Sequence, residues 1–173
     1  MAKQLIITEK PSVARDIAGA LGGFTEEQGY FESETWVLTW AVGHLFELLE
    51  PEEIDPEYKR WTLANLPIIP ETFKTKPKQG QTERVRTIKK LLERADVEAV
   101  VNACDAGREG ELIFREIVEH FGSAKPIRRL WLQSMTEDAI RDGFAHLRPG
   151  EELEHLGAAA RARPLTDALI GMN

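Results

Sequence analysis

DAGREGEL, residues Asp105 to Leu112, places three carboxylates and two glycines in a run of eight residues. The apolar run Val100 to Cys104 precedes it, and apolar residues at helical spacing follow it, at Ile113, Ile117 and Phe121. This order predicts a buried strand, a short loop and a helix, with the acidic residues where the strand gives way to the helix. In open α/β sheets, that end of a strand is where ligands and metals bind.

A second acidic residue follows a second apolar run near the start of the chain. Leu5 to Thr8 predicts a strand that ends at Glu9. Pro11 then stands where a helix can begin, because a residue in the first turn needs no N–H. Apolar residues at helical spacing follow, and the Gly22–Gly23 pair predicts the end of that helix. If the two strands are parallel neighbours, Glu9 and Asp105 meet at one edge of the sheet.

The other segments predict further strands and helices around these two units. Tyr30 to Val42 alternates in a way that predicts a β-hairpin packed on one side, and Glu50 to Gly80 predicts a long irregular excursion. Ile127 to Leu132 predicts one more strand. Three further helices are predicted: Thr82 to Ala95, one capped by Thr136, and Glu151 to Ile170 with an interruption at Pro164. The order predicts an α/β fold with a mainly parallel sheet, helices on both faces and one β-hairpin.

Composition limits the class of protein. The chain has 173 residues, 42% hydrophobic and 29% charged, which fits a globular domain with a substantial core. Its net charge of -7 argues against a general nucleic-acid binder, although an acidic chain can still contact DNA through a metal. One cysteine, Cys104, cannot form an internal disulfide, and no apolar run approaches the ~20 residues of a membrane span. We therefore expect a cytoplasmic protein that does not enter a membrane.

The acidic residues have two explanations. Two carboxylates ~4 Å apart repel by roughly 1 to 4 kcal/mol, so a fold that gathers Glu9, Asp105 and Glu109 needs a compensating cation. Mg²⁺ suits such a site, because it takes one or two carboxylates together with waters and substrate phosphates. Gly107 would then let backbone approach a ligand closely. Alternatively, the acids of DAGREGEL only favour the positive end of a helix, by about 0.3 to 1 kcal/mol each.

Five stretches of the chain together resemble a known family. They are TEKPS (Thr8 to Ser12), GYFESETWVLTWAVGHL (Gly29 to Leu45), LPIIPETFK (Leu66 to Lys74), DAGREGE (Asp105 to Glu111) and RRLWLQSMTEDAIRDGF (Arg128 to Phe144). They are similar to the N-terminal Toprim domain of type IA DNA topoisomerases, specifically those of the bacterial topoisomerase III kind. The resemblance implies a compact, Rossmann-like Toprim domain over residues 1–150. It also implies that residues 151–173 form a helix resembling the truncated start of the next topoisomerase domain.

The resemblance also implies roles for individual residues. Glu9, Asp105 and Glu109 match the acidic Mg²⁺ site, and Glu9 also matches a candidate general acid or base. Lys10 matches a lysine that contacts the scissile phosphate region, and Arg108 matches the arginine inside the acidic motif. The implied chemistry is phosphoryl transfer between DNA and a tyrosine hydroxyl, in which positioning and charge neutralisation do most of the work.

Other positions refine or depart from the family pattern. Many Toprim motifs have aspartate at the position of Gly107, so Glu111 or water would have to replace one ligand here. His44, in the GHL match, is an expected DNA contact beside Lys10 and Arg108, with a structural role as the alternative. The nucleophilic tyrosine of the family has no counterpart, because Tyr30 and Tyr58 lie in unrelated contexts.

We therefore expect the Toprim part of a type IA DNA topoisomerase. It would bind single-stranded or negatively supercoiled DNA and supply the Mg²⁺ half of a cleavage and rejoining site. Its partners would be the remaining topoisomerase domains, which bring the tyrosine, so the isolated chain should be inactive. The alternatives are a stand-alone Toprim nuclease or primase-like enzyme, and a non-catalytic regulatory module.

Overall fold

The computed structural model describes residues 1–60, 62–69, 74–153 and 165–171. Within these ranges, seven strands form the main sheet in the order β2-β3-β4-β1-β7-β8-β9. Their bounds are β1 Lys3–Thr8, β2 Thr25–Glu27, β3 Tyr30–Glu32, β4 Trp36–Trp40, β7 Val97–Ala103, β8 Ile127–Arg129 and β9 Arg148–Pro149. The strands β4, β1, β7 and β8 are parallel, whereas β2, β3 and β9 add antiparallel partners at the two sides. The predicted mainly parallel sheet is confirmed.

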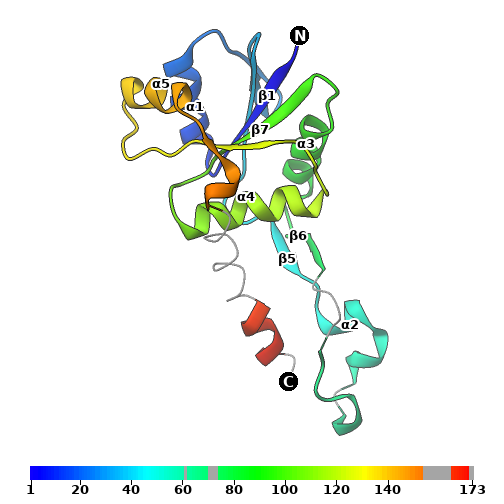
Figure 1. The fold of residues 1–173 in the computed structure, drawn as a ribbon. Coiled ribbons are helices and arrows are strands. Elements are labelled where there is room, and N and C mark those ends of the chain that lie inside the picture. Colours follow the sequence, from blue (N-terminus) through cyan, green and yellow to red (C-terminus); the bar gives the residue numbers. More distant parts are fainter. Residues whose placement is uncertain (61, 70–73, 154–164, 172–173) are drawn as a thin grey trace.

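Helices cover both faces of this sheet (Figure 1). On one face, α1 (Pro11–Leu21) and α5 (Glu137–Ala145) pack over a cluster that includes Ile6 and Leu38. On the other face, α3 (Thr82–Leu92) and α4 (Arg108–His120) pack over a cluster that includes Leu5 and Ile7. Successive residues of β1 thus point into opposite layers, as the two-residue period of a strand requires. Every helix predicted up to Thr136 is present.

Connections after β1 and β7 run to opposite faces. The strand β1 leads into α1 on one face, and its neighbour β7 leads into α4 on the other. The carboxyl ends of these two strands are therefore a topological switch point, where open α/β sheets place their ligand crevice. Glu9 and Asp105 both lie at this point.

One detail of the predicted hairpin is wrong. The strands β3 and β4 do form an antiparallel pair, with Phe31 opposite Leu38. However, β4 also pairs with β1 in parallel, and Val37, Leu38 and Thr39 are all fully buried. The hairpin is not packed on one side only, because β4 is an inner strand with helices above and below it.

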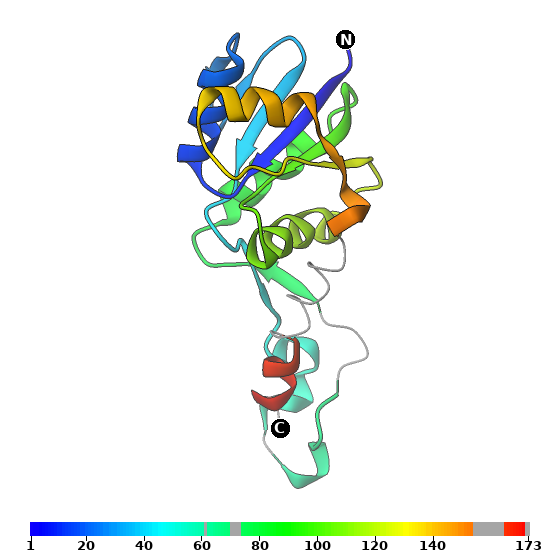
Figure 2. The ribbon, with the colours of Figure 1, turned by 60° about the vertical axis from the view of Figure 1, so that its left-hand side comes forward.

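The expected irregular excursion contains regular structure. A second, two-stranded antiparallel sheet joins β5 (Phe46–Leu48) to β6 (Thr75–Pro77). Beyond it lie the short helix α2 (Pro51–Ile54) and two 3₁₀ turns, η1 (Pro56–Lys59) and η2 (Leu63–Asn65). Both views show these elements as an arm that leads away from the main sheet (Figures 1 and 2).

The end of the chain is described in two pieces. Gly150–Leu153 forms a 3₁₀ turn, η3, and residues 165–171 are helical. The middle of the helix predicted from Glu151 to Ile170, including Pro164, lies outside the described residues. In the described part of the chain, no helix has the length and apolar character needed to span a membrane.

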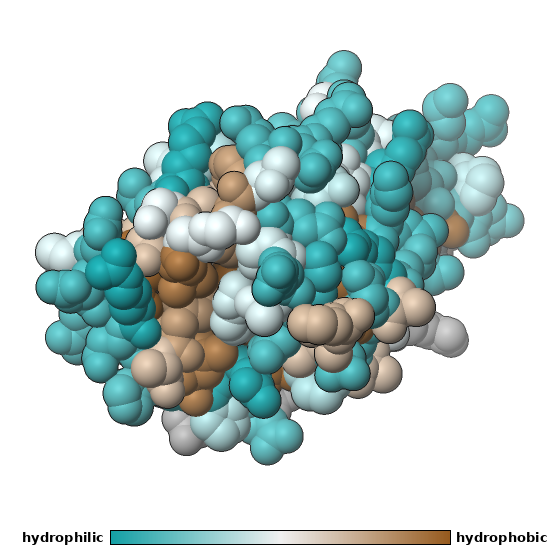
Figure 3. All heavy atoms as spheres, turned by 90° about the horizontal axis from the view of Figure 1, so that it is seen from above, coloured by the Kyte–Doolittle hydropathy of each residue, from teal (hydrophilic) through white to brown (hydrophobic). Residues whose placement is uncertain are grey.

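Viewed from the amino-terminal end of β1, most of the visible surface is polar, and hydrophobic side chains gather in one strip (Figure 3). Partly buried hydrophobic residues on the α1 and α5 layer include Leu21, Phe24 and Phe144. The hydrophobic cluster between the sheet and the helices α1 and α5 is therefore not completely covered by polar side chains.

Candidate metal centre

Glu9 and Asp105 are brought to one edge of the sheet by the parallel pairing of β1 with β7. Thr8 and Ala103 are partners in the register of these strands, Glu9 follows Thr8 directly, and Asp105 comes two residues after Ala103. Backbone hydrogen bonds also fix the position of Glu9: Gly43 N donates to Glu9 O at 3.3 Å, and Ala41 N donates to Thr8 O at 2.8 Å. The sequence predicted that Glu9 and Asp105 would meet only if their strands were parallel neighbours, and β1 and β7 are such neighbours.

The fold satisfies the Glu9 carboxyl only in part. Its Oε2 atom is buried and accepts no hydrogen bond from the described residues. Burial raises the pKa of Glu9, the neighbouring Asp105 carboxylate raises it further, and Lys10 lowers it. Two ionised carboxylates cannot donate a hydrogen bond to each other, so only a shared proton or a cation satisfies both groups.

Glu109 faces a different partner. Its side chain is 75% exposed, and its Oε2 accepts a hydrogen bond from His44 Nε2 at 3.0 Å. The other ring nitrogen of His44 lies 3.1 Å from Glu116 Oε2. The hydrogen bond to Glu116 raises the pKa of His44 to about 9, with Glu109 adding to the effect and burial opposing it. At neutral pH, His44 is therefore a cation held between two glutamates.

The donor set that remains fits a magnesium ion with few protein ligands. Among the described residues, no group of three or more histidine, cysteine, aspartate or glutamate side chains is placed to hold a metal. The pair of Glu9 and Asp105 supplies two carboxylates, and one Glu9 oxygen is unpartnered. Mg²⁺ commonly binds through one or two carboxylates, with water and substrate phosphate completing its shell.

The two glycines of the acidic motif have separate structural reasons. Gly107 has φ +145°, a conformation that side chains rarely adopt, so an aspartate at this position would be strained in the present loop. At Gly110, a Cβ would collide with the carbonyl oxygen of Asp105 and lie 2.8 and 2.9 Å from its backbone C and N atoms. Gly110 thus lets the first turn of α4 pack directly against the Asp105 backbone.

Glu111 is not available as a replacement ligand. Its side chain is 1% exposed, and its Oε1 accepts a hydrogen bond from Arg115 Nε at 3.1 Å. Its Oε2 accepts from Asn102 Nδ2 at 3.0 Å and lies 3.3 Å from Arg129 Nε. The structure does not support Glu111 as the ligand that completes the metal shell, because both of its oxygens are engaged inside the fold.

Sequence reasoning missed Asn102 and Arg129, which are both buried beneath the acidic loop. Asn102 interrupts the apolar strand VVNAC, and Arg129 lies next to Arg128 in the predicted strand IRRLWL. A buried polar residue is normally hydrogen-bonded, so the interruption at Asn102 was a usable signal. Glu111 also shares a helical face with Phe114 and Val118, which already indicated that it points inward.

Two basic residues lie at the exposed side of the same edge. Lys10 precedes α1 and Arg108 begins α4, and both residues are exposed. Within the described residues, neither side chain makes a hydrogen bond or ion pair. They are therefore free to meet an anion that approaches Glu9 and Asp105.

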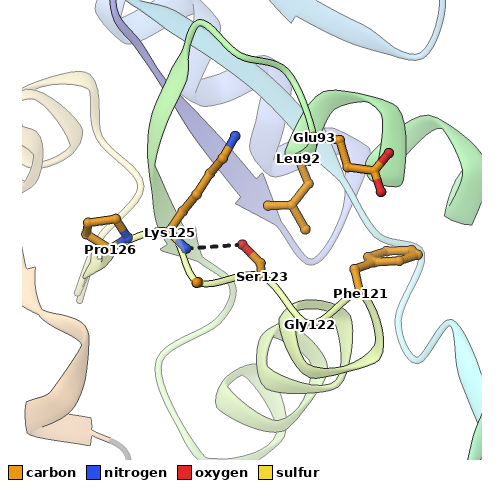
Figure 4. A pocket seen from close by; sticks show the side chains of 8 residues that line it. Leu92, Glu93, Phe121, Gly122, Ser123, Lys125 and Pro126 are labelled. Atoms are coloured by element: carbon orange, nitrogen blue, oxygen red, sulfur yellow. Dashed lines mark hydrogen bonds between the residues drawn. The ribbon is translucent and has the colours of Figure 1, made fainter.

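A crevice of about 380 Å³ opens beside Asp105. Its other walls come from the start of α1, at Val13, and from the segment after β8, including Leu132 and Met135. A larger hollow, of about 530 Å³, lies at the opposite edge of the sheet between the ends of α3 and α4 (Figure 4). Leu92 and Phe121 help to line that hollow, and it contains none of the DAGREGEL residues. Of the two hollows, only the smaller crevice borders the acidic motif, at Asp105 and Ala106.

Comparison with known proteins decides the family. A family model described as the Toprim domain matches residues 4–135. The chain belongs to the Toprim family. Its fold is also similar to the solved structure of full-length topoisomerase I from Thermotoga maritima, with a TM-score of 0.55 and 19% identity. That match covers 84% of this Toprim chain and 21% of the other chain.

Curated relatives of this Toprim chain are bacterial proteins named DNA topoisomerase 3. One from Bacillus thuringiensis (strain Al Hakam) is 46% identical over 173 residues, and one from Staphylococcus haemolyticus (strain JCSC1435) is 46% identical over 171 residues. The matches cover 100% and 99% of this chain. They cover only 24% of each relative, so the Toprim chain spans about a quarter of the length of these proteins.

Proposed function

We propose that this Toprim domain supplies the Mg²⁺-binding, acidic half of a type IA topoisomerase site. Single-stranded or negatively supercoiled DNA would be cleaved and rejoined there, in the cytoplasm, with other domains providing the tyrosine nucleophile. The observation that carries the proposal is the pairing of Glu9 with Asp105 at the switch point, where a buried carboxylate oxygen has no donor among the described residues. The similarity to proteins named DNA topoisomerase 3 supports the choice of chemistry.

Each residue at the edge has a separate task in this proposal. Bound Mg²⁺ supplies neutralisation of charge on the phosphoryl group. Glu9 and Asp105 are the residues that would hold it. Lys10 and Arg108, both exposed and without a side-chain hydrogen bond in the described chain, bind the DNA phosphates on either side. Glu9 can also hold or release a proton, because burial and the Asp105 carboxylate raise its pKa.

The nucleophile comes from elsewhere in the proposal. Tyr30 packs against the core layer of α3 and α4, and Tyr58 lies in η1 on the arm. The relatives are about four times as long as this chain, which leaves ample sequence for a tyrosine-bearing domain. His44 is kept by Glu109 and Glu116, so a direct DNA contact by His44 would require it to leave them.

A chimaera tests this function directly. This chain would replace the matching segment of the Staphylococcus haemolyticus relative, and relaxation of negatively supercoiled plasmid would be followed with and without Mg²⁺. We expect relaxation that depends on Mg²⁺ and that falls by at least two orders of magnitude in the Glu9→Gln chimaera. The matched control is Glu32→Gln. Glu32 is a partly buried acid at the opposite edge of the sheet, so this chimaera should relax plasmid nearly as fast as the parent.

Two outcomes would contradict the proposal. One is a Glu9→Gln chimaera that relaxes plasmid as fast as the parent chimaera. The other is Mg²⁺-dependent nicking of plasmid by the isolated chain, lost in Glu9→Gln, which would favour a stand-alone Toprim nuclease.

A further inference from the structure

Arg129 is the largest fully buried side chain among the described residues, and it is charged. It lies at the end of β8, 24 residues after Asp105 in the sequence, yet it contacts the backbone at the start of the motif. Burying a guanidinium is unfavourable unless hydrogen-bond acceptors and opposite charge compensate for the lost water. The partners that satisfy it therefore show what the residue does.

Those partners are the backbone carbonyls at the end of β7. Arg129 Nη1 donates to Cys104 O at 2.7 Å and to Asn102 O at 2.9 Å, and Nη2 donates to Asp105 O at 2.9 Å. The ladder between β7 and β8 ends at Asn102 and Arg129. Beyond the end of this ladder, the Arg129 guanidinium, in place of a neighbouring strand, donates hydrogen bonds to the carbonyls of Cys104 and Asp105.

A second layer keeps the guanidinium in place. Asn102 Oδ1 accepts from Arg129 Nη1 at 3.0 Å and from Cys104 N at 3.1 Å. Glu111 Oε2 lies 3.3 Å from Arg129 Nε, close enough for an ion pair although not aligned as a hydrogen bond. Glu111 is fixed in turn by Asn102 and by Arg115, which also donates to Gly150 O at 2.8 Å. These hydrogen bonds together hold the two Nη atoms of the Arg129 guanidinium, its fork, against the β7 carbonyls.

We propose that Arg129 is a positioning residue for the Mg²⁺ site: its fork fixes the Asp105 backbone and so sets the Asp105 carboxylate against Glu9. The inference rests on the proposed function, because it assumes that these two carboxylates bind Mg²⁺. Arg129 does not touch the ion. The last glutamate of DAGREGEL, Glu111, serves the site indirectly by anchoring Arg129.

Arg129→Lys is the discriminating substitution. Lysine keeps the positive charge beside Glu111, but one ammonium cannot reproduce the planar fork that binds several carbonyls at once. Loss of a supporting partner of a metal ligand typically weakens metal binding by about 10- to 100-fold. We expect the Mg²⁺ dissociation constant to rise by at least about tenfold in Arg129→Lys.

Calorimetric titration of the 173-residue chain with Mg²⁺, without DNA, tests the proposal. Arg94→Lys is the matched control, because Arg94 makes a comparable set of bonds to Glu32 and Asp96 at the opposite edge of the sheet. Both variants should melt at lower temperature without Mg²⁺, whereas only Arg129→Lys should bind Mg²⁺ more weakly. Equal Mg²⁺ affinity in Arg129→Lys and wild type would overturn the inference, as would an equal loss in Arg94→Lys.

If Arg129→Lys does not fold, Asn102→Ser provides the test, because it removes the amide that aligns the fork and leaves the guanidinium in place. It should also weaken Mg²⁺ binding, and an unchanged affinity would overturn the inference. Failure of the wild-type chain to bind Mg²⁺ would overturn the proposed site itself. Wild-type binding with unaffected variants would overturn only the role of Arg129.

Discussion

Glu32 and Asp96, at the amino edge of the main sheet, and Glu9, at its carboxyl edge, lie in opposite electrostatic surroundings. At the amino edge, Glu32 Oε1 lies 2.6 Å from Lys3 Nζ and 2.7 Å from Arg94 Nη2, and Asp96 Oδ2 lies 2.7 Å from Arg94 Nη2. The hydrogen bond from Arg94 lowers the pKa of Glu32 to about 2, and Arg94 has the same effect on Asp96. At the carboxyl edge, burial and Asp105 raise the pKa of Glu9.

This difference distinguishes the acids that the fold pairs with cations from the acid at the proposed site. The fold can pair its carboxylates with cations, as the amino edge shows, so the unpartnered Glu9 oxygen at the carboxyl edge is not a general property of its acids. Shifts of pKa that oppose the charged form are typical of sites that act on a ligand. The contrast predicts that Glu32→Gln and Glu9→Gln have effects of opposite sign on the free energy of unfolding.

The largest expected effect is stabilisation by Mg²⁺. At 100 times its dissociation constant, Mg²⁺ should add about 2.7 kcal/mol to the free energy of unfolding, a rise in melting temperature of several degrees at this size. Asp105→Asn should lose most of this rise, whereas Glu32→Gln should keep it, because the amino edge does not bind the ion. Thermal melts of the three proteins with and without Mg²⁺ check this. An equal rise in melting temperature in wild type and Asp105→Asn would show that Mg²⁺ does not bind at the carboxyl edge.

Glu32→Gln should have the next largest effect, as a loss of stability. Because the pKa of Glu32 is lowered to about 2 from an ordinary 4.5, its contribution is present above pH 4.5 and is lost as the pH falls through about 2. The full difference corresponds to about 3 kcal/mol, and partial exposure reduces it to about 2 kcal/mol at pH 7. Urea denaturation at pH 7 and pH 3 measures it. A loss that does not shrink at the lower pH would contradict the ion-pair explanation.

His44→Gln should destabilise the fold by about 1 kcal/mol, because Glu109 is exposed and water screens its attraction. The pKa of His44 is raised to about 9 from 6.5. Its contribution is therefore complete below pH 6.5 and is lost as the pH rises through about 9. Wild type and variant should differ in denaturant midpoint at pH 6 and converge near pH 10. A constant difference across this range would show that packing, not charge, is responsible.

Glu9→Gln should produce the smallest effect, with the opposite sign to that of Glu32→Gln. Because the pKa of Glu9 is raised, its contribution is complete below pH 4.5 and is lost as the pH rises through the folded-state pKa. Without Mg²⁺ at pH 7, the variant should be more stable by about 1 kcal/mol or less, the repulsion of two charges ~4 Å apart in a water-like dielectric. Chemical denaturation in EDTA measures this. A clear destabilisation would show that Glu9 is satisfied by the fold.

Much of the fold was predictable because its determinants are local. Helical and strand periodicity identified β1, α1, β7 and α4, and Thr136 caps α5 as predicted, with Ala139 N donating to its Oγ1 at 3.2 Å. The Gly22–Gly23 stop coincides with the end of α1 at Leu21. By contrast, β2, β9 and the pair of β5 with β6 are only two or three residues long, too short for periodicity to show them.

The sequence by itself determined that acids follow two apolar strands, and this made a shared site conditional on those strands being neighbours. Only the tertiary structure decided the condition, by pairing β1 with β7, and only it assigned each acid a partner. Glu9 and Asp105 face each other, Glu109 lies on His44, and Glu111 is buried with Arg129. Hydrophobic period is set within one element, whereas the partner of a charged side chain is set by residues far away in the chain. The role of each carboxylate is therefore a property of the packed sheet.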